Sequence, residues 1–194
     1  MTRQESADVL RAARDGSPEA LGVLFDRCAG RLLSIIRLRM GRDLRARLES
    51  RDILQNTLLK SFQRLDQFEG GDGASLMAWL ARIAENEIRD QADFQHRQRR
   101  DIAAGVSLDD THAPPVVAQV RSALSQAVLS EEAGRLEDAL EALDADHREV
   151  IVLRKLEELS FKEVAERMGR SEDACRMLLA RAMTALTLRM RATT

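Results

Sequence analysis

The stretch from Leu159 to Arg176 constrains the fold most, because it carries the start and stop signals of two short helices around a tight turn. Ser160, with Glu163 three residues later, forms a capping box at the start of the first helix. Gly169 falls where that helix must end, since glycine adopts the left-handed conformation at little cost. Ser171 can then cap a second helix. The pattern predicts a helix-turn-helix, which inserts its second helix into the major groove of DNA, although an ordinary helical hairpin gives the same signals.

The composition favours helices throughout the chain. The 194 residues include no Tyr and only three Pro, and 44% of them are hydrophobic while 3% are aromatic. Buried cores must therefore be built from aliphatic side chains, and few residues interrupt a helix. We expect an all-α protein.

Apolar periodicity places the individual helices. Apolar residues recur every three or four positions from Leu21 onwards, which predicts a helix that ends at Gly41. A further helix is expected from about Asp52, with Phe62 among its inward-facing residues. The segment 69–75 contains three glycines and reads as a loop, and a long helix should follow it to about Arg100. Trp79 shares the apolar face of that helix, so we interpret it as a core residue rather than a base-stacking one.

The pattern weakens in the middle of the chain, which divides it into domains. Residues 101–130 contain Pro114-Pro115, Asp109-Asp110 and several serines, and they indicate a flexible acidic linker. We therefore expect two small helical domains, over residues 1–100 and 131–194.

Charge is distributed unevenly along the chain. The net charge of the whole chain is −2, which by itself argues against DNA binding. Residues 1–100 carry a net +3, residues 101–150 a net −8 and residues 151–194 a net +3. Two mildly basic ends therefore flank an acidic middle, and the basic ends can contact phosphates.

Several classes of protein are disfavoured. The N-terminus has no apolar run typical of a signal peptide, and no segment reaches the roughly 20 apolar residues of a membrane span, so we expect a cytoplasmic protein without membrane insertion. Cys28 and Cys175 fall on apolar helix faces and are interpreted as buried, reduced thiols. Neither a metal-ligand spacing, a glycine-rich phosphate loop nor a catalytic triad pattern is present, so we expect no cofactor, no metal and no enzymatic activity.

Four motifs resemble those of the extracytoplasmic-function (ECF) sigma factors of the sigma-70 family, in particular a planctomycete-like subgroup. Residues 52–58 resemble the Asp-Leu-Val-Gln-Glu-Thr-Phe stretch of region 2.2, and residues 79–86 the Trp-Leu-x-x-Ile-Ala-x-Asn run of regions 2.3 and 2.4. Residues 147–154 and 159–161 are similar to region 4.1, and the helix-turn-helix to region 4.2. The resemblance implies a sigma-2 helical bundle and a sigma-4 helix-turn-helix domain.

The resemblance also implies partners and roles. Core RNA polymerase would bind through its β′ clamp helices and its β flap, promoter DNA through both domains, and an anti-sigma factor or other regulator is a further expected partner. The β′ contact would fall on the outward polar residues Asp52, Gln55, Asn56 and Gln63. Asn56 stands where the family usually has Glu.

Promoter contacts follow from the same resemblance. The −10 element would be read, with one base flipped into the loop, by Gly71, Asp72, Gly73, Asn86, Arg89, Asp90, Arg97, Arg99 and Arg100. The −35 element would be read by Arg170, Ser171, Arg176, Met177 and Arg181. Two departures bear on DNA affinity: Asp93 stands where a basic residue is common, and Leu178 removes a positive charge.

Two other functions fit part of the pattern. A stand-alone helix-turn-helix regulator that binds duplex DNA without polymerase would explain the C-terminal motif but not the N-terminal ones. A polymerase-binding adaptor that no longer recognises promoters would fit the departures at Asp93 and Leu178. The resemblance favours a sigma factor that directs promoter recognition and DNA melting at transcription initiation.

Overall fold

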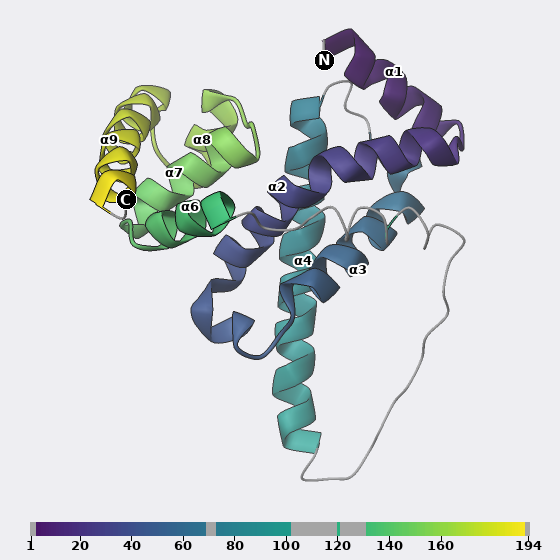
Figure 1. Ribbon diagram of the computed structural model, residues 1–194, viewed down its shortest axis with the longest axis horizontal. Helices are drawn as coiled ribbons and strands as arrows, with labels where there is room; N and C mark the ends of the chain where they lie inside the picture. Colours follow the sequence, from purple (N-terminus) through teal and green to yellow (C-terminus); the bar gives the residue numbers. More distant parts are fainter. Residues whose placement is uncertain (1–2, 69–72, 102–119, 121–130, 193–194) are drawn as a thin grey trace.

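The computed structural model describes two groups of helices that pack side by side (Figure 1). It describes residues 3–68, 73–101, 120 and 131–192. Within these ranges every regular element is a helix, and no strand is present, which confirms the all-α fold.

The N-terminal domain consists of α1 to α4. Its elements are α1 (Arg3–Arg14), α2 (Pro18–Arg45), α3 (Ser50–Gln63), the short 3₁₀ helix η1 (Leu65–Gln67) and α4 (Gly73–Asp101). Ser17 caps α2, since its hydroxyl accepts a hydrogen bond from the Ala20 amide at 3.2 Å, and Pro18 occupies the first turn. Aliphatic side chains of all four α-helices form one core, as the composition requires.

Gly41 breaks α2 where the sequence predicted its end. Its backbone has φ 65° and ψ 175°, a conformation that side-chain-bearing residues rarely adopt, and the chain bends there before a last helical turn. The bend carries Arg42 and Arg45 toward the C-terminal domain, where both pair with Glu141.

The C-terminal domain consists of α6 to α9. Its elements are α6 (Glu131–Glu141), α7 (Ala145–Ile151), a π-helical turn η2 (Val152–Leu156), α8 (Phe161–Met168) and α9 (Glu172–Ala192). They enclose a second aliphatic core around Leu140, Leu153 and Val164. Asp144 occupies the N-cap position of α7, although its side chain makes no capping hydrogen bond.

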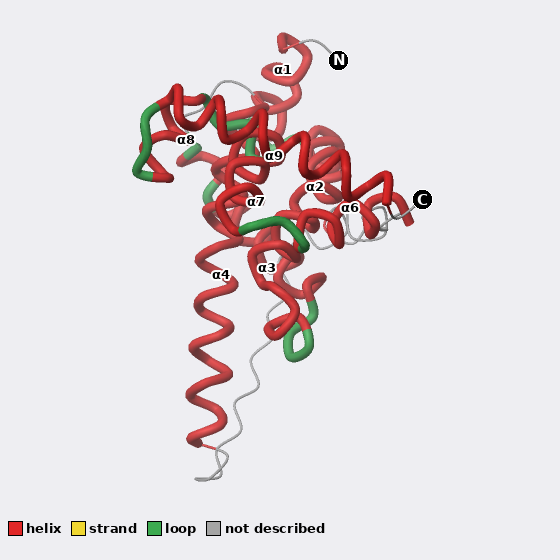
Figure 2. Tube along the Cα trace, turned by 90° about the vertical axis from the view of Figure 1, so that its left-hand side faces the viewer, coloured by secondary structure: helices red, strands yellow, loops and turns green. Residues whose placement is uncertain are grey.

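The two cores touch along α2. Leu38 of α2 is buried in the C-terminal core, and Leu156 packs against both cores. Val120, the residue that the structure describes between α4 and α6, is buried against the N-terminal core. The C-terminal half of α4 projects away from both domains in two perpendicular views (Figures 1 and 2).

Two expectations about aromatic residues had different outcomes. Trp79 is partly buried: it packs against the N-terminal core, as predicted, and its ring centroid lies 5.3 Å from that of Phe68. Phe62 was expected to face inward, and this is wrong, because its side chain is 36% exposed. Ser61, one residue earlier in α3, is buried instead.

Candidate functional site

The helix-turn-helix has the local geometry that the sequence predicted. The Glu163 amide donates to the Ser160 hydroxyl at 3.3 Å, and the Ser160 amide donates to the Glu163 carboxylate at 2.7 Å, which completes the capping box. Gly169 ends α8 in the left-handed conformation, with φ 64° and ψ 37°. Ser171 caps α9 by accepting a hydrogen bond from the Ala174 amide at 3.2 Å. These contacts fix the angle at which α9 leaves the turn.

The helix α9 has one buried and one exposed side. Cys175, Ala182 and Leu186 are buried in the C-terminal core. All five residues predicted to read the −35 element are exposed, namely Arg170, Ser171, Arg176, Met177 and Arg181. Leu178 is partly buried against the core, so it lies at the edge of the exposed side rather than on it.

Two of these arginines are oriented by neighbouring groups. Arg170 pairs with Asp146 at the start of α7. Arg176 pairs with Glu172 at 2.9 Å and Asp173 at 2.8 Å, and its guanidinium lies 4.9 Å from the ring centroid of Phe161. Exposed pairs of this kind are weak, so a phosphate or a guanine edge can replace the carboxylates as partners.

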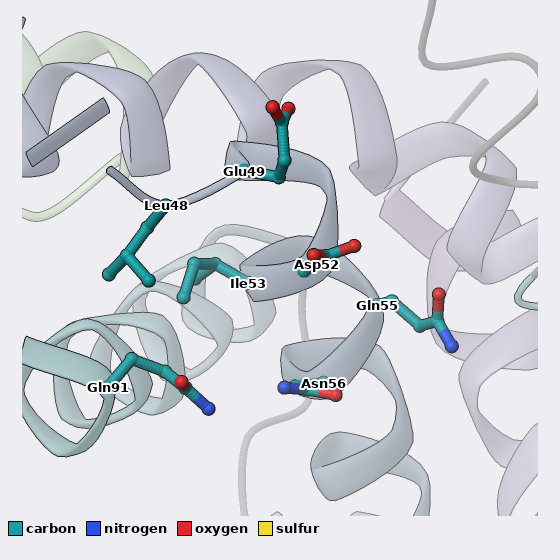
Figure 3. Close-up of a pocket in the computed structure, with 7 residues that line it drawn as sticks. All are labelled: Leu48, Glu49, Asp52, Ile53, Gln55, Asn56 and Gln91. Carbon is teal, nitrogen blue, oxygen red and sulfur yellow. The ribbon is translucent and has the colours of Figure 1, made fainter. Parts of the chain in front are cut away.

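A polar hollow of about 300 Å³ lies beside the start of α3 (Figure 3). It is lined by Leu48, Glu49, Asp52, Ile53, Gln55, Asn56 and Gln91. Three of the four predicted polymerase-contact residues therefore line one hollow, whereas the fourth, Gln63, is exposed near the end of α3 and is not part of its lining. Leu48, Glu49 and Gln91 were not predicted, because they lie outside the motif on α3.

A buried carboxylate supports the wall of this hollow. Glu87 of α4 is 2% exposed, and it accepts hydrogen bonds from Asn56 at 3.0 Å, from Gln91 at 3.1 Å and from Lys60. Asn56 is therefore half-buried and held by Glu87, rather than fully outward as expected from its spacing along α3. The clue in the sequence was an acidic residue next to Ile88 on the apolar face of α4.

The residues predicted to read the −10 element are distributed along α4 and the segment before it. Asn86, Arg89 and Asp90 are exposed on one stretch of the helix, where Arg89 donates to the Asn86 side-chain oxygen at 3.4 Å and Asp90 lies 3.6 Å from Lys60. Three further residues have helical backbone near the end of α4, namely Arg97, Arg99 and Arg100. Gly73 is the first residue of α4, and Gly71 and Asp72 lie outside the described residues.

Metal-binding groups and membrane-spanning helices are absent from the residues that the structure describes. In that part of the chain, no three His, Cys, Asp or Glu side chains form a group suited to a metal ion. No helix there combines the length and the apolar character needed to cross a membrane.

Comparison with family models decides the identity of the two domains. The model for sigma-70 region 2 matches residues 24–100, and the model for sigma-70 region 4 matches residues 133–186. Together the matches cover about two thirds of the chain. The chain belongs to the sigma-70 family. The region 2 match falls on the N-terminal domain with its polar hollow, and the region 4 match contains the helix-turn-helix.

Solved structures share the fold of this sigma-70 family member. One is the structure of CnrH in complex with the cytosolic domain of CnrY. The matched chain of that structure is 24% identical to this chain with a TM-score of 0.52, and the match covers 97% of this chain and 99% of the other. Another is the sigma factor RpoE in complex with the anti-sigma factor NepR from Bartonella quintana, which is 21% identical with a TM-score of 0.50, over 89% and 95% of the two chains. Among curated proteins no significant sequence match was found.

Membership of the sigma-70 family confirms the function predicted from the sequence at the level of the family. The chain is a transcription initiation factor whose partners are core RNA polymerase and promoter DNA. A stand-alone regulator is not favoured, because region 2 accounts for the N-terminal motifs that such a protein would leave unexplained.

Proposed function

We propose that this chain is an ECF-type sigma factor in which the hollow on α3 docks on polymerase, α4 reads the −10 element and α9 reads the −35 element. One observation carries the proposal: a single chain joins region 2, with a polar hollow at its surface, to region 4, with an exposed recognition helix. A DNA-binding regulator needs only the second feature.

The chemistry of the hollow suits a polar and basic partner surface. Glu49 and Asp52 contribute carboxylates at its rim, and Gln55, Asn56 and Gln91 contribute amides. Because Glu87 holds Asn56 and Gln91 in place, these amides lose little conformational freedom on binding. We assign this surface to the β′ clamp helices and the exposed part of the C-terminal domain to the β flap.

Strand opening needs no catalytic step by this chain. A surface that binds an unpaired base favours melted DNA over duplex, and the free energy of that binding drives the opening. Asn86 can donate to and accept from a base edge, and the arginines near the end of α4 add sequence-independent attraction to phosphates. We therefore propose no enzymatic activity and no cofactor.

We also propose a cellular location, a subgroup and a regulatory partner for this sigma factor. We place it in the cytoplasm, where bacterial polymerase works, and we assign it to a planctomycete-like subgroup on the Arg-Met-Leu run at residues 176–178. RpoE, which has a similar fold, forms a complex with the anti-sigma factor NepR. A regulator of the same class is therefore a proposed partner of this chain.

The direct test is a pull-down with purified bacterial core polymerase, followed by runoff transcription from genomic fragments. Stable binding with new promoter-specific transcripts is the expected result. Binding without transcripts would instead indicate an adaptor, and specific duplex binding without polymerase would indicate a stand-alone regulator.

A matched pair of variants tests the docking surface. Changing Asp52 and Gln55 together to Ala removes two groups from the hollow, and we expect core affinity to fall at least about tenfold. Asp66→Ala is the control, because Asp66 is exposed on η1 of the same domain and does not line the hollow. Equal core affinity in both variants would refute the docking assignment.

A further inference from the structure

The aromatic ring of Phe161 is contacted by two arginine side chains from different elements. The guanidinium carbon of Arg154, in the π-helical turn η2, lies 5.0 Å from the ring centroid, and that of Arg176, on α9, lies 4.9 Å from it. Both distances fall within the roughly 6 Å at which an aromatic ring attracts a cation. Because the two guanidiniums share one centroid, they are at most about 10 Å apart.

Packing and backbone contacts fix the position of the ring. Phe161 is the first residue of α8, directly after the capping box at Ser160, and it is partly buried against the C-terminal core. The Leu159 amide donates to the Leu153 carbonyl at 3.0 Å, which ties the start of α8 to η2. Long arginine side chains are ordered only where something holds them. The fixed ring therefore acts as a platform for both guanidiniums.

The π-helical turn brings Arg154 to this platform. The Glu157 amide donates to the Val152 carbonyl at 2.9 Å, five residues earlier, so the backbone departs from the α-helical pattern. Turns of this kind are rare and occur frequently at functional sites. Val152 and Leu153 are buried, whereas Arg154 is half-buried and reaches the ring of Phe161. The turn thus adds a cation that is absent from the residues assigned to the −35 element.

The carboxylates and the ring that contact Arg176 differ in how they respond to DNA. The side chains of Glu172 and Asp173 are 44% and 92% exposed, so their pairs with Arg176 are weak, and a phosphate backbone repels them. The ring of Phe161 is neutral and is not repelled. A guanidinium that stacks on a ring keeps its N–H groups free to donate. Arg176 can therefore stay on the ring while it donates to a guanine edge.

We propose that Phe161 is a positioning residue for −35 recognition, whose ring holds Arg176 against a base edge and Arg154 against a phosphate of the same strand. At about 3.4 Å of helix axis per nucleotide, both arginines reach one strand within about three nucleotides. Phe161 itself need not touch DNA. The inference rests on the proposed function for the DNA that the arginines meet, whereas the contacts with the ring belong to the free protein.

Two replacements of Phe161 separate positioning from packing. Phe161→Leu keeps an apolar side chain against the core but removes the aromatic face, and Phe161→Tyr keeps both. A ring that only fills space would be replaceable by leucine without effect on base preference. A ring that positions Arg176 is replaceable by tyrosine and not by leucine.

The first measurement uses the free, full-length protein. Nuclear magnetic resonance of the arginine side chains reports proximity to a ring, because the ring current shifts the signals of nearby protons. The signals of Arg154 and Arg176, assigned with the two single alanine variants, should be shifted upfield in the parent protein and in F161Y. In F161L they should return to the values of solvated arginine.

The second measurement uses polymerase reconstituted with each variant. Runoff transcription is measured on the promoter identified with the parent protein and on its single-base-pair substitutions in the −35 element. Phe161→Leu should lower the preference for the parent base pair about threefold, at the one position where Arg176→Ala abolishes it. Arg154→Ala should weaken all templates by a similar factor, because phosphate contacts carry no sequence information. Phe161→Tyr should match the parent.

Met168→Ala is the packing control. Met168 packs against the same core from the other end of α8 and lies outside the proposed DNA surface. Its replacement should lower stability in urea denaturation without a change in base preference. A double variant adds a measure of coupling: in the Arg176→Ala background, Phe161→Leu should cause no further loss of base preference, since the ring acts through that arginine.

Four results would overturn the inference. They are unshifted arginine signals in the parent protein, a base preference in F161L equal to that of the parent, an effect of F161L spread evenly over all −35 positions, and full additivity with Arg176→Ala. A parent protein that directs no transcription would refute the proposed function, and with it the DNA role of the ring. An active parent with an unchanged F161L would refute the inference alone.

Discussion

Replacement of Glu87 by Gln should destabilise the N-terminal domain far more than a charge change at its surface. The Glu87 carboxylate is 2% exposed and accepts hydrogen bonds from Lys60, Asn56 and Gln91. A glutamine at this position is nearly isosteric but offers a single acceptor oxygen. The amide nitrogen of the new glutamine would face a group that donates to Glu87 in the parent protein, on Lys60, Asn56 or Gln91. The Lys60 ammonium would also lose its buried counter-charge.

The magnitude follows from these contacts. A hydrogen bond to a charged group contributes about 1.5–3 kcal/mol, and an unsatisfied buried donor costs a further 1–3 kcal/mol. The Lys60 side chain is 39% exposed and can regain water, which offsets part of the loss. We expect Glu87→Gln to lower the free energy of unfolding by about 2–3 kcal/mol, a large share of the 5–15 kcal/mol typical of a folded protein.

Urea denaturation measures this loss, with Asp90→Asn as the matched control. Asp90 is 67% exposed and lies 3.6 Å from the same Lys60 ammonium, so its replacement should cost less than about 0.5 kcal/mol. With a slope near 2 kcal/mol per molar urea, the midpoint of Glu87→Gln should fall by about 1–1.5 M. Equal small shifts in the two variants would refute the reasoning, because burial would then make no difference.

The dependence of stability on pH gives a second test of the contribution of Glu87. Burial alone would raise the pKa of Glu87, but hydrogen bonds from Lys60, Gln91 and Asn56 outweigh it and hold the pKa below its ordinary value of 4.5. The Glu87 carboxylate therefore binds a proton more readily in the unfolded chain than in the folded protein. Its stabilisation is complete above pH 4.5 and is lost as the pH falls through the lower pKa of the folded state. The difference in stability between the parent protein and Glu87→Gln should shrink below pH 4.5 and stay constant between pH 6 and 7.

Three further predictions concern other parts of the molecule. Arg176→Ala should weaken transcription that depends on the −35 element about tenfold without loss of core binding. Arg191→Ala removes the same charge near the far end of α9 and should leave this transcription unchanged. Runoff assays with altered −35 sequences compare the two variants. Gly169→Ala should lower stability by about 1 kcal/mol in chemical denaturation, because φ is 64° although an added Cβ meets no atom. Burial raises the pKa of Cys28 to about 11, so mass spectrometry should find its alkylation at pH 8 slow until urea unfolds the protein.

The features predicted correctly from the sequence are those that depend on neighbours along the chain. Ser160, Glu163, Gly169 and Ser171 act within a few residues of each other, and each adopts the capping or turn role expected of it. Gly41 ends the regular part of α2 for the same local reason. Apolar periodicity likewise placed Cys175 on an apolar helix face, and Cys175 is buried in the structure, because helical spacing decides which residues share a face.

Prediction was weaker wherever a second element decides the environment. Asn56 has the spacing of an outward residue, but Glu87 on α4 holds it half-buried, and nothing within α3 indicates this. Phe62 has the spacing of an inward residue, but it lies in the last turn of α3 and its side chain is 36% exposed. In both cases the spacing within α3 is correct, and packing against the rest of the domain determines the outcome.

The charge pattern along the chain also could not be interpreted without knowing which residues meet in the folded protein. The net −8 over residues 101–150 was visible in the sequence, but its partners were not, because Arg37 and Glu137 are 100 residues apart. In the folded protein Glu137, Glu141 and Glu149 face arginines of α2, so part of the acidic middle neutralises the basic N-terminal domain. A net charge near zero therefore does not argue against nucleic-acid binding in this chain. The cations are present but paired, and the attraction between domains depends on the same opposite charges that a phosphate backbone would compete for.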